Sequence, residues 1–277
     1  MNDIARESLE AFAKTLVAVR RVKPLVHHIT NYVTVNDCAN ATLAIGASPI
    51  MADAAEEAGD IAAISSSVVL NIGTLNPRTI ESAISAGRRA NCLRKPVIFD
   101  PVGAGASKLR NDATARILGE VDVSVIRGNI SEVGFILGLG TSARGVDASE
   151  GDRDADSGRV ALECAAKLKC VVAVTGAVDA VSNGVRTVRI KNGHEAMAGV
   201  TGTGCVCSSL VGSFCGASPD ALFESAVSAI ASMGIAGEIA FERAGALGNG
   251  SFRVALIDAI GKLDEAAFMG RAKLYEA

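Results

Sequence analysis

The sequence has no tryptophan and few aromatic residues, and this limits how its core can be built. Of the 277 residues, 4% are aromatic and 49% are hydrophobic. The core must therefore be packed mainly from Ala, Val, Ile and Leu. Side chains of this size suit helices that lie close against a mostly parallel β-sheet.

A strong charge of either sign is also missing. The formal net charge is −3, and the Lys and Arg residues are scattered along the chain. Without a basic stripe, neither nucleic acid nor an anionic membrane is expected as the main partner. A membrane span would need about 18 uninterrupted apolar residues. The most apolar window, 226–237, is interrupted by Ser228 and Ser232.

Signals of secretion and of disulfide pairing are absent as well. The first residues include early acids and no apolar segment like that of a signal peptide. The seven cysteines are odd in number and form no C-x-x-C motif. This pattern predicts reduced thiols in a cytoplasmic protein rather than a disulfide framework or a zinc site.

Short apolar segments alternate with helical segments between residues 25 and 175. This alternation predicts an α/β fold with a mostly parallel sheet and helices on both faces. Neither a linker nor an internal repeat is evident, so we expect one domain spanning 1–277. The predicted strands are 25–29, 48–51, 67–72, 96–100, 122–126 and 171–175.

The later part of the chain departs from this alternation. Residues 180–190, with Asn183-Gly184 at the turn, predict a hairpin that adds antiparallel edge strands. Three helices are predicted at 205–217, at 219–242 with Pro219 at its start, and at 252–267, packed on one face. The Gly-, Ser- and charge-rich segment 141–159 is predicted to be a solvated loop.

Polar residues gather where the predicted strands end. They are Asp100, then Arg127 with Glu132, then Thr175, and finally the loop at 201–205. The carboxyl ends of parallel strands lie at one edge of a sheet, where α/β folds bind ligands. Two acids at this edge could hold Mg²⁺, and Thr and Arg could meet nucleotide phosphates. Glu132 could instead simply complement the dipole of the helix that it begins.

The stretch from Val200 to Cys205 reads as a glycine-containing loop that opens directly into an apolar helix. Free N–H groups at a helix start favour an anion, and glycines let the anion approach them. A plain turn before a core helix remains the alternative interpretation of this stretch. Competing motifs fail, since neither G-x-x-x-x-G-K-[ST] nor G-x-S-x-G occurs. A G-x-G-x-x-G candidate beginning at Gly202 lacks its third glycine.

Taken together, the segments resemble the hydroxyethylthiazole kinases of thiamine salvage, a family of the ribokinase-like superfamily. The matches follow the family's order over about residues 25 to 217. They are ITNYVT (29–34), GASPIMA (46–52), LNIGTL (70–75), FDPVGA (99–104), RGNISE (127–132), VTG (174–176) and VTGTGC (200–205).

The resemblance implies a three-layer ribokinase-like fold and a kinase that uses ATP and Mg²⁺. The γ-phosphoryl group would move to the hydroxyl of 4-methyl-5-(2-hydroxyethyl)thiazole. The resemblance also implies a homotrimer in which the thiazole binds between subunits. By motif, Met51 and Gly202 would contact the thiazole, with Asn31 as a neighbour.

The remaining implied roles concern the nucleotide, the metal and the reacting alcohol. Arg127 and Thr175 would contact ATP, while Asp100 and Glu132 would serve the metal directly or through water. Cys205 stands where the wider superfamily has an aspartate base, as it does in the thiazole kinases. A helix start lowers the pKa of a thiol, whereas neighbouring phosphates raise it. Three roles for Cys205 therefore stay open, namely a base, a group that positions the alcohol, and a packing residue.

Two other functions remain as alternatives. One is a kinase of another small vitamin alcohol, such as hydroxymethylpyrimidine or pyridoxal, although the segments around Asn31 and Met51 favour the thiazole. The other is a non-catalytic sensor of nucleotide or thiazole. The combined presence of Asp100, Glu132 and Cys205 argues against a sensor, because pure binding does not need metal and acceptor groups together.

Overall fold

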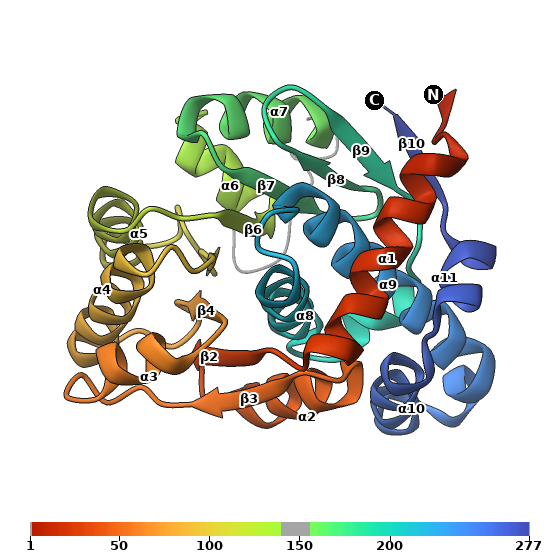
Figure 1. Cartoon of the computed structure of the whole chain (residues 1–277), viewed down its shortest axis with the longest axis horizontal. Coiled ribbons are helices and arrows are strands. Elements are labelled where there is room, and N and C mark those ends of the chain that lie inside the picture. Colours follow the sequence, from red (N-terminus) through yellow and green to blue (C-terminus); the bar gives the residue numbers. More distant parts are fainter. Residues whose placement is uncertain (1, 140–155, 277) are drawn as a thin grey trace.

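The computed structural model describes residues 2–139 and 156–276. Its centre is a sheet in which ten strands of the described residues follow the order β1-β10-β9-β8-β7-β6-β5-β4-β2-β3 (Figure 1). The strands β2 to β7 pair in parallel, and the pairs formed by β8, β9, β10 and β1 are antiparallel. Their bounds are β1 Asn2–Asp3, β2 Leu25–Ile29, β3 Ser48–Met51, β4 Ser67–Asn71, β5 Val97–Asp100, β6 Val125–Asn129, β7 Val171–Thr175, β8 Asp179–Ser182, β9 Thr187–Ile190 and β10 Leu274–Glu276.

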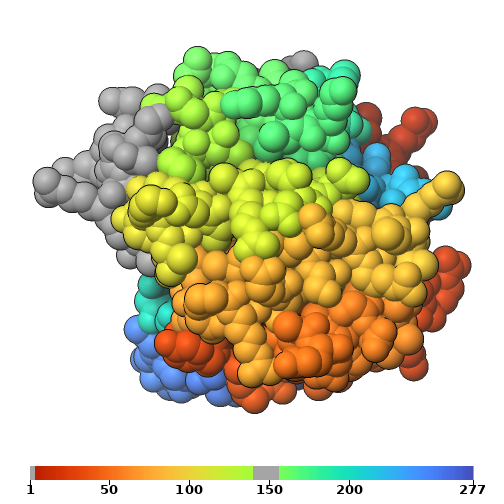
Figure 2. Space-filling model, turned by 90° about the vertical axis from the view of Figure 1, so that its left-hand side faces the viewer, coloured from red at the N-terminus to blue at the C-terminus, as the bar shows by residue number. Residues whose placement is uncertain are grey.

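Helices cover both faces of this sheet, which confirms the predicted three-layer α/β fold. One layer holds α3 Ala58–Ile64, α4 Pro77–Cys92, α5 Lys108–Glu120, α6 Ile130–Leu137 and α7 Ser157–Leu168. The other holds α1 Arg6–Val22, α2 Val35–Ile45, α8 Thr203–Ala217, α9 Leu222–Ala244, α10 Asn249–Lys262 and α11 Glu265–Arg271. Figure 2 shows the continuous outer face that the orange to yellow segments of the first layer form.

Side chains along the parallel strands alternate between the two layers, as the period of a strand requires. In β4, Val68 and Leu70 pack toward α3 and α4, whereas Val69 packs in the core that contains α8. The helix α8 approaches the sheet closely, because a Cβ on Gly212 would lie 2.4 Å from Cγ2 of Val69. The glycine at position 212 therefore lets α8 pack closely against the middle of β4.

Several predicted boundaries differ from the structure. The strand predicted at 122–126 begins at Val125 and continues to Asn129, so Arg127 lies inside β6 rather than after it. The helix predicted to begin with Pro219 begins at Leu222, and Pro219 lies in the preceding turn. The helix predicted at 252–267 is two helices, because the side chain of Asp264 caps a new helix start by accepting a hydrogen bond from the Ala267 N–H.

The structure confirms the predicted hairpin, whereas it describes only the end of the predicted loop. The strands β8 and β9 pair antiparallel with a four-residue connection, and β10 and β1 extend the sheet beyond them. Most of the loop predicted at 141–159 lies outside the described residues, while α7 already begins at Ser157.

The segment 222–247 is long and apolar enough for a membrane span, but its most apolar window is 78% buried within the protein. It is therefore the core helix α9 with the short turn that follows it.

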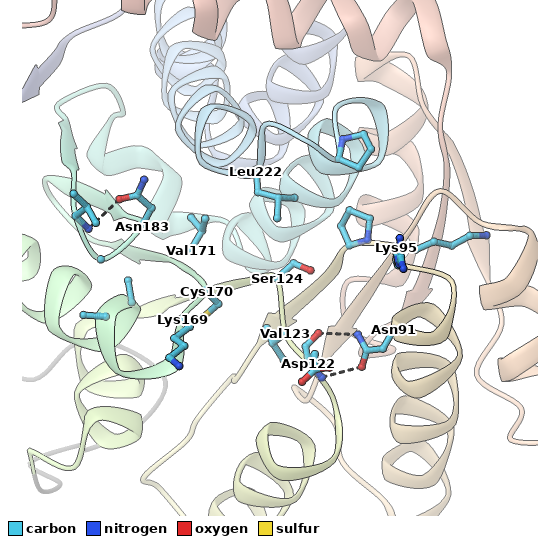
Figure 3. A pocket seen from close by; sticks show the side chains of 17 residues that line it. Asn91, Lys95, Asp122, Val123, Ser124, Lys169, Cys170, Val171, Asn183 and Leu222 are labelled. Carbon is cyan, nitrogen blue, oxygen red and sulfur yellow. Dashed lines mark hydrogen bonds between the residues drawn. The ribbon is translucent and has the colours of Figure 1, made fainter.

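A cavity of about 820 Å³ lies at the amino ends of β5, β6 and β7 (Figure 3). Its wall includes Asn91, whose side-chain amide both donates to and accepts from the backbone of Asp122 at 2.8 Å. Lys95 also lines it, but its ammonium donates to the carbonyl of Ala62. None of the polar residues predicted to form the functional site lines this cavity.

Candidate active site

The register of the parallel strands brings polar residues together at the carboxyl edge of the sheet. Asn71 at the end of β4 is directly opposite Asp100 at the end of β5. Asn129 in β6 is opposite Thr175 in β7, and Arg127 lies two residues before Asn129 on the same face of β6. The face that Val69, Ile98 and Val125 occupy packs in the core that contains α8. Asn71, Asp100 and Arg127 follow them at a spacing of two and therefore face the start of α8.

Asp100 is buried, with 1% of its surface exposed. Its Oδ2 accepts hydrogen bonds from Nδ2 of Asn71 and from Oγ of Ser208 in α8, both at 2.7 Å. Nη1 of Arg127 lies 4.0 Å from the same oxygen. Burial raises the pKa of Asp100, and the charge of Arg127 opposes this rise. Oδ1 of Asp100 is buried without a hydrogen-bond partner among the described residues, so it remains an available acceptor.

Glu132 occupies the first turn of α6 and is held by backbone N–H groups. Its Oε1 accepts from Gly103 N and its Oε2 accepts from Asn129 N, both at 2.8 Å. Together with Asn129 it forms a capping box, which explains locally why the chain begins a helix here. Burial, followed by the negative charge of Asp100, raises the pKa of Glu132 to about 7.

The two carboxylates fit a magnesium ion whose other ligands are water molecules and phosphate oxygens. Asp100 offers the unpartnered Oδ1, and Glu132 offers the free lone pairs of a carboxylate whose oxygens each accept one N–H. Within the described residues, no group of three or more His, Cys, Asp and Glu side chains forms a cage for a metal ion. This sparse set agrees with magnesium chemistry, in which one or two carboxylates act together with substrate phosphates.

Arg127 connects the acids with the end of β7. Its Nη2 donates to Oγ1 of Thr175 at 2.6 Å, and that hydroxyl donates to the carbonyl of Gly128 at 3.3 Å. The start of α8 lies against the same guanidinium, because a Cβ on Gly204 would lie 2.7 Å from Nη1 of Arg127. Glycine at position 204 therefore allows the helix start to approach a partly buried cation.

Gly202 immediately precedes α8 and has φ of +84°, in the left-handed region that favours glycine. A Cβ at this position would lie 2.2 Å from Cγ2 of Thr34. Thr34 in turn donates from its N and Oγ1 to Oδ1 of Asn31, both at 3.1 Å. The loop before α8 and the segment after β2 are therefore fitted tightly to each other.

Cys205 lies in the first turn of α8, where two amide side chains surround its sulfur. Nδ2 of Asn31 is 3.2 Å from Sγ and Nδ2 of Asn71 is 3.3 Å from it. Asn31 also donates to Oδ1 of Asn71 at 2.9 Å. Burial and then the charge of Asp100 raise the pKa of Cys205, although the asparagine contacts oppose this rise. The pKa of Cys205 thus lies above its ordinary value, which favours the protonated thiol at neutral pH.

Met51 lies at the same edge, at the end of β3, and is opposite His28 in β2. It is partly buried and packs against the core that contains α8. The carbonyl of the next residue, Ala52, accepts a 2.6 Å hydrogen bond from Nε2 of His27. The buried imidazole therefore fixes the backbone that follows Met51.

Sequence reasoning assigned no role to Asn71 or Ser208, although both contact Asp100. A usable signal for Asn71 was its amide at the end of an otherwise apolar strand. Ser208 lies three residues after Cys205, at a spacing that places both on one side of a helix. Neither signal separates a functional residue from a turn or helix residue without the register of the sheet.

The three-layer fold is ribokinase-like, and its carboxyl edge brings two acids and an arginine close to a glycine-flanked helix start. A solved ribokinase-like superfamily protein from Enterococcus faecalis supports the fold, with a TM-score of 0.60, 11% identity, and coverage of 96% of this chain and 100% of that one. The model of the hydroxyethylthiazole kinase family matches residues 16–266, and the chain belongs to this family.

Two relatives extend over nearly the whole chain. The hydroxyethylthiazole kinase of Ruminiclostridium cellulolyticum is 56% identical over 271 residues, which cover 98% of this chain and 99% of the relative. The solved hydroxyethylthiazole kinase protein of Pyrococcus horikoshii is 40% identical with a TM-score of 0.87, and the match covers 97% of this chain and 99% of that chain.

Proposed function

We propose that this protein is a hydroxyethylthiazole kinase that transfers the γ-phosphoryl group of ATP to the hydroxyl of 4-methyl-5-(2-hydroxyethyl)thiazole in thiamine salvage. The observation that carries the proposal is the placement of Cys205. Its sulfur lies at the start of α8, within reach of the amides of Asn31 and Asn71. Asn71 also contacts the buried Asp100, so the acceptor end and the metal end of the site share one side chain.

Nucleotide binding is assigned to the part of the edge around β6 and β7. Arg127 and Thr175 would bind the ATP phosphates, and the backbone N–H groups between Gly202 and Cys205 would stabilise charge on the transferring group. Asp100 and Glu132 would hold Mg²⁺, which when bound neutralises charge on the phosphates. Asp100 fits a direct ligand because its Oδ1 is free, and Glu132 fits a contact through water.

Cys205 acts by positioning the alcohol rather than by removing its proton. Its raised pKa keeps the sulfur protonated, and a protonated thiol is a poor base. Asn31 and Asn71 fix the sulfur from two sides, so the acceptor hydroxyl has a defined neighbour. Phosphoryl transfer through a loose transition state depends mostly on position and electrostatics, so the reaction does not need a strong base at Cys205.

The assembly and location belong to the same proposal. We expect a cytoplasmic, single-domain homotrimer with Met51 and Gly202 contacting a thiazole bound between subunits. Support for a subunit contact near the site comes from Tyr32, which follows Asn31 and is 80% exposed, and from Val33, which is 55% exposed. Sedimentation of the purified protein tests the trimer.

The decisive experiment is a comparison of ADP release with four acceptors under identical Mg²⁺ and ATP concentrations. The acceptors are the thiazole alcohol, hydroxymethylpyrimidine, pyridoxal and ribose. We expect the thiazole alcohol to give the highest kcat/KM. A higher value with the pyrimidine or pyridoxal would replace the proposed substrate. ADP release that no acceptor stimulates, combined with tight nucleotide binding, would indicate a sensor.

A further inference from the structure

Arg110 in α5 makes an unusual set of contacts with two loops at the carboxyl edge. Its Nη1 donates to the carbonyl of Ile72 at 2.7 Å and to the carbonyl of Val102 at 2.5 Å. Its Nη2 donates to the carbonyl of Gly73 at 2.8 Å. One guanidinium therefore binds three backbone oxygens from the segments that follow β4 and β5.

These two segments carry both ends of the candidate active site. The first follows Asn71, whose amide contacts Cys205 and Asp100. The second follows Asp100 and contains Gly103, whose N–H donates to Glu132. A bridge between the segments therefore helps to fix Asn71, the amide partner of the thiol, relative to the two carboxylates.

Other contacts hold the N–H groups of these segments, whereas Arg110 holds their carbonyls. Gly73 N donates to Oδ1 of Asn71 at 2.9 Å, and Gly105 N donates to Oδ1 of Asn111 at 2.7 Å. The chain also makes space for the guanidinium. At Gly103, where φ is +72°, a Cβ would lie 3.0 Å from Cδ of Arg110.

The contacts of Arg110 require the shape of a guanidinium as well as its charge. Two nitrogens in a rigid plane reach three oxygens, whereas a lysine has a single nitrogen on a flexible stem. Within the described residues no carboxylate forms an ion pair with Arg110, and its partly buried guanidinium donates instead to carbonyl oxygens. In this part of the chain, Arg110 therefore does not act as one half of a surface salt bridge.

We propose that Arg110 is a positioning residue for phosphoryl transfer, which fixes the segment after Asn71 against the segment after Asp100. The kinetic part of this inference rests on the proposed function. Its structural part concerns the ligand-free protein and can be tested without turnover.

The structural test is hydrogen exchange of the ligand-free protein, measured on peptides that cover 71–76 and 101–106. We expect Arg110→Met to accelerate exchange in both segments, because local opening then needs fewer broken bonds. The matched control is Arg116→Met on the same helix, where the side chain pairs with Glu81 and Glu120 at the surface. Unchanged exchange in either segment of Arg110→Met, or equal acceleration in the control, would overturn the inference.

The kinetic test compares wild type, Arg110→Met, Arg110→Lys and Arg116→Met at a temperature where circular dichroism shows all of them folded. We expect kcat of Arg110→Met to fall about 10- to 100-fold, as for residues that orient metal-binding groups, with a smaller change in KM for the alcohol. Arg110→Lys should recover only part of kcat. Should Arg110→Met fail to fold, the comparison of Arg110→Lys with Arg116→Met applies the same criteria.

The results separate this inference from the proposed function. A wild type that phosphorylates none of the four acceptors would refute the function, while the exchange experiment would still decide the bridge. An active wild type together with an Arg110→Met variant of equal kcat would refute the role of Arg110 alone. Full activity of Arg110→Lys would show that charge suffices and would refute the requirement for a two-nitrogen bridge.

Discussion

Replacing Gly202 with alanine should destabilise the start of α8 for two separable reasons. The φ of +84° at this position costs an alanine about 1–2 kcal/mol. The new Cβ would also lie 2.2 Å from Cγ2 of Thr34. Thr34 is 3% exposed and its hydroxyl is bonded to Asn31, so it has little freedom to move away. Overpacking of this kind adds about 1–3 kcal/mol, so we expect the free energy of unfolding to fall by about 2–5 kcal/mol.

The two contributions can be measured by urea unfolding of Gly202→Ala alone and combined with Thr34→Ser. Serine keeps the hydroxyl but removes the clashing methyl group, so the double variant should recover part of the loss. The control is Gly119→Ala in α5, where a Cβ meets nothing within 4 Å, and it should stabilise the helix by about 0.5–1 kcal/mol. A Gly202→Ala protein as stable as wild type would refute the reasoning. The absence of any recovery by Thr34→Ser would refute the assignment to the methyl contact.

Three further predictions concern the reacting groups. Cys205→Ala should lower kcat, whereas Cys205→Ser should retain more activity because serine can still position an alcohol. An alanine variant with the kcat of wild type would show that the thiol has no catalytic part. Asp100→Asn should raise the Mg²⁺ concentration needed for half-maximal rate, and an unchanged Mg²⁺ titration would rule out the metal assignment. Because the folded-state pKa of Glu132 is raised from 4.5 to about 7, its protonated form stabilises the fold below pH 4.5 and this contribution is lost as the pH rises through 7. Glu132→Gln should therefore flatten the fall of unfolding free energy between pH 5 and 7.5 without Mg²⁺, and identical slopes would contradict the raised pKa.

Much of the site could be predicted from the sequence because strand ends have a simple geometry. Asp100 and Thr175 end apolar segments, and the ends of parallel strands meet at one edge whatever the details of the helices. Both bounds of β6 were predicted three residues too early, because the polar and glycine residues at 127–129 give no apolar strand signal. Arg127 nevertheless lies at the predicted edge, since it shares one face of the sheet with Asn71 and Asp100.

The properties that depend on burial and on distant contacts could not be obtained in this way. The rise in the pKa of Cys205 comes from burial and from Asp100, and neither is visible in the residues next to the thiol. The role of Asn71 depends on its register against Asp100. The role of Arg110 depends on contacts with Ile72 and Gly73, which lie 38 and 37 residues before it in the sequence. The pairing of β1 with β10 joins the two ends of the described chain, and no local pattern specifies it.

The two outer strands of the sheet limit how copies of this chain can associate. At one side, β3 contains Pro49, which has no backbone N–H to offer to a further strand. At the other, β1 comprises two of the described residues, Asn2 and Asp3. Short strands and prolines at such positions hinder the edge-to-edge growth that leads to aggregation. Assembly of this protein is therefore expected to use the side chains of helices and loops, with each sheet ending within its own subunit.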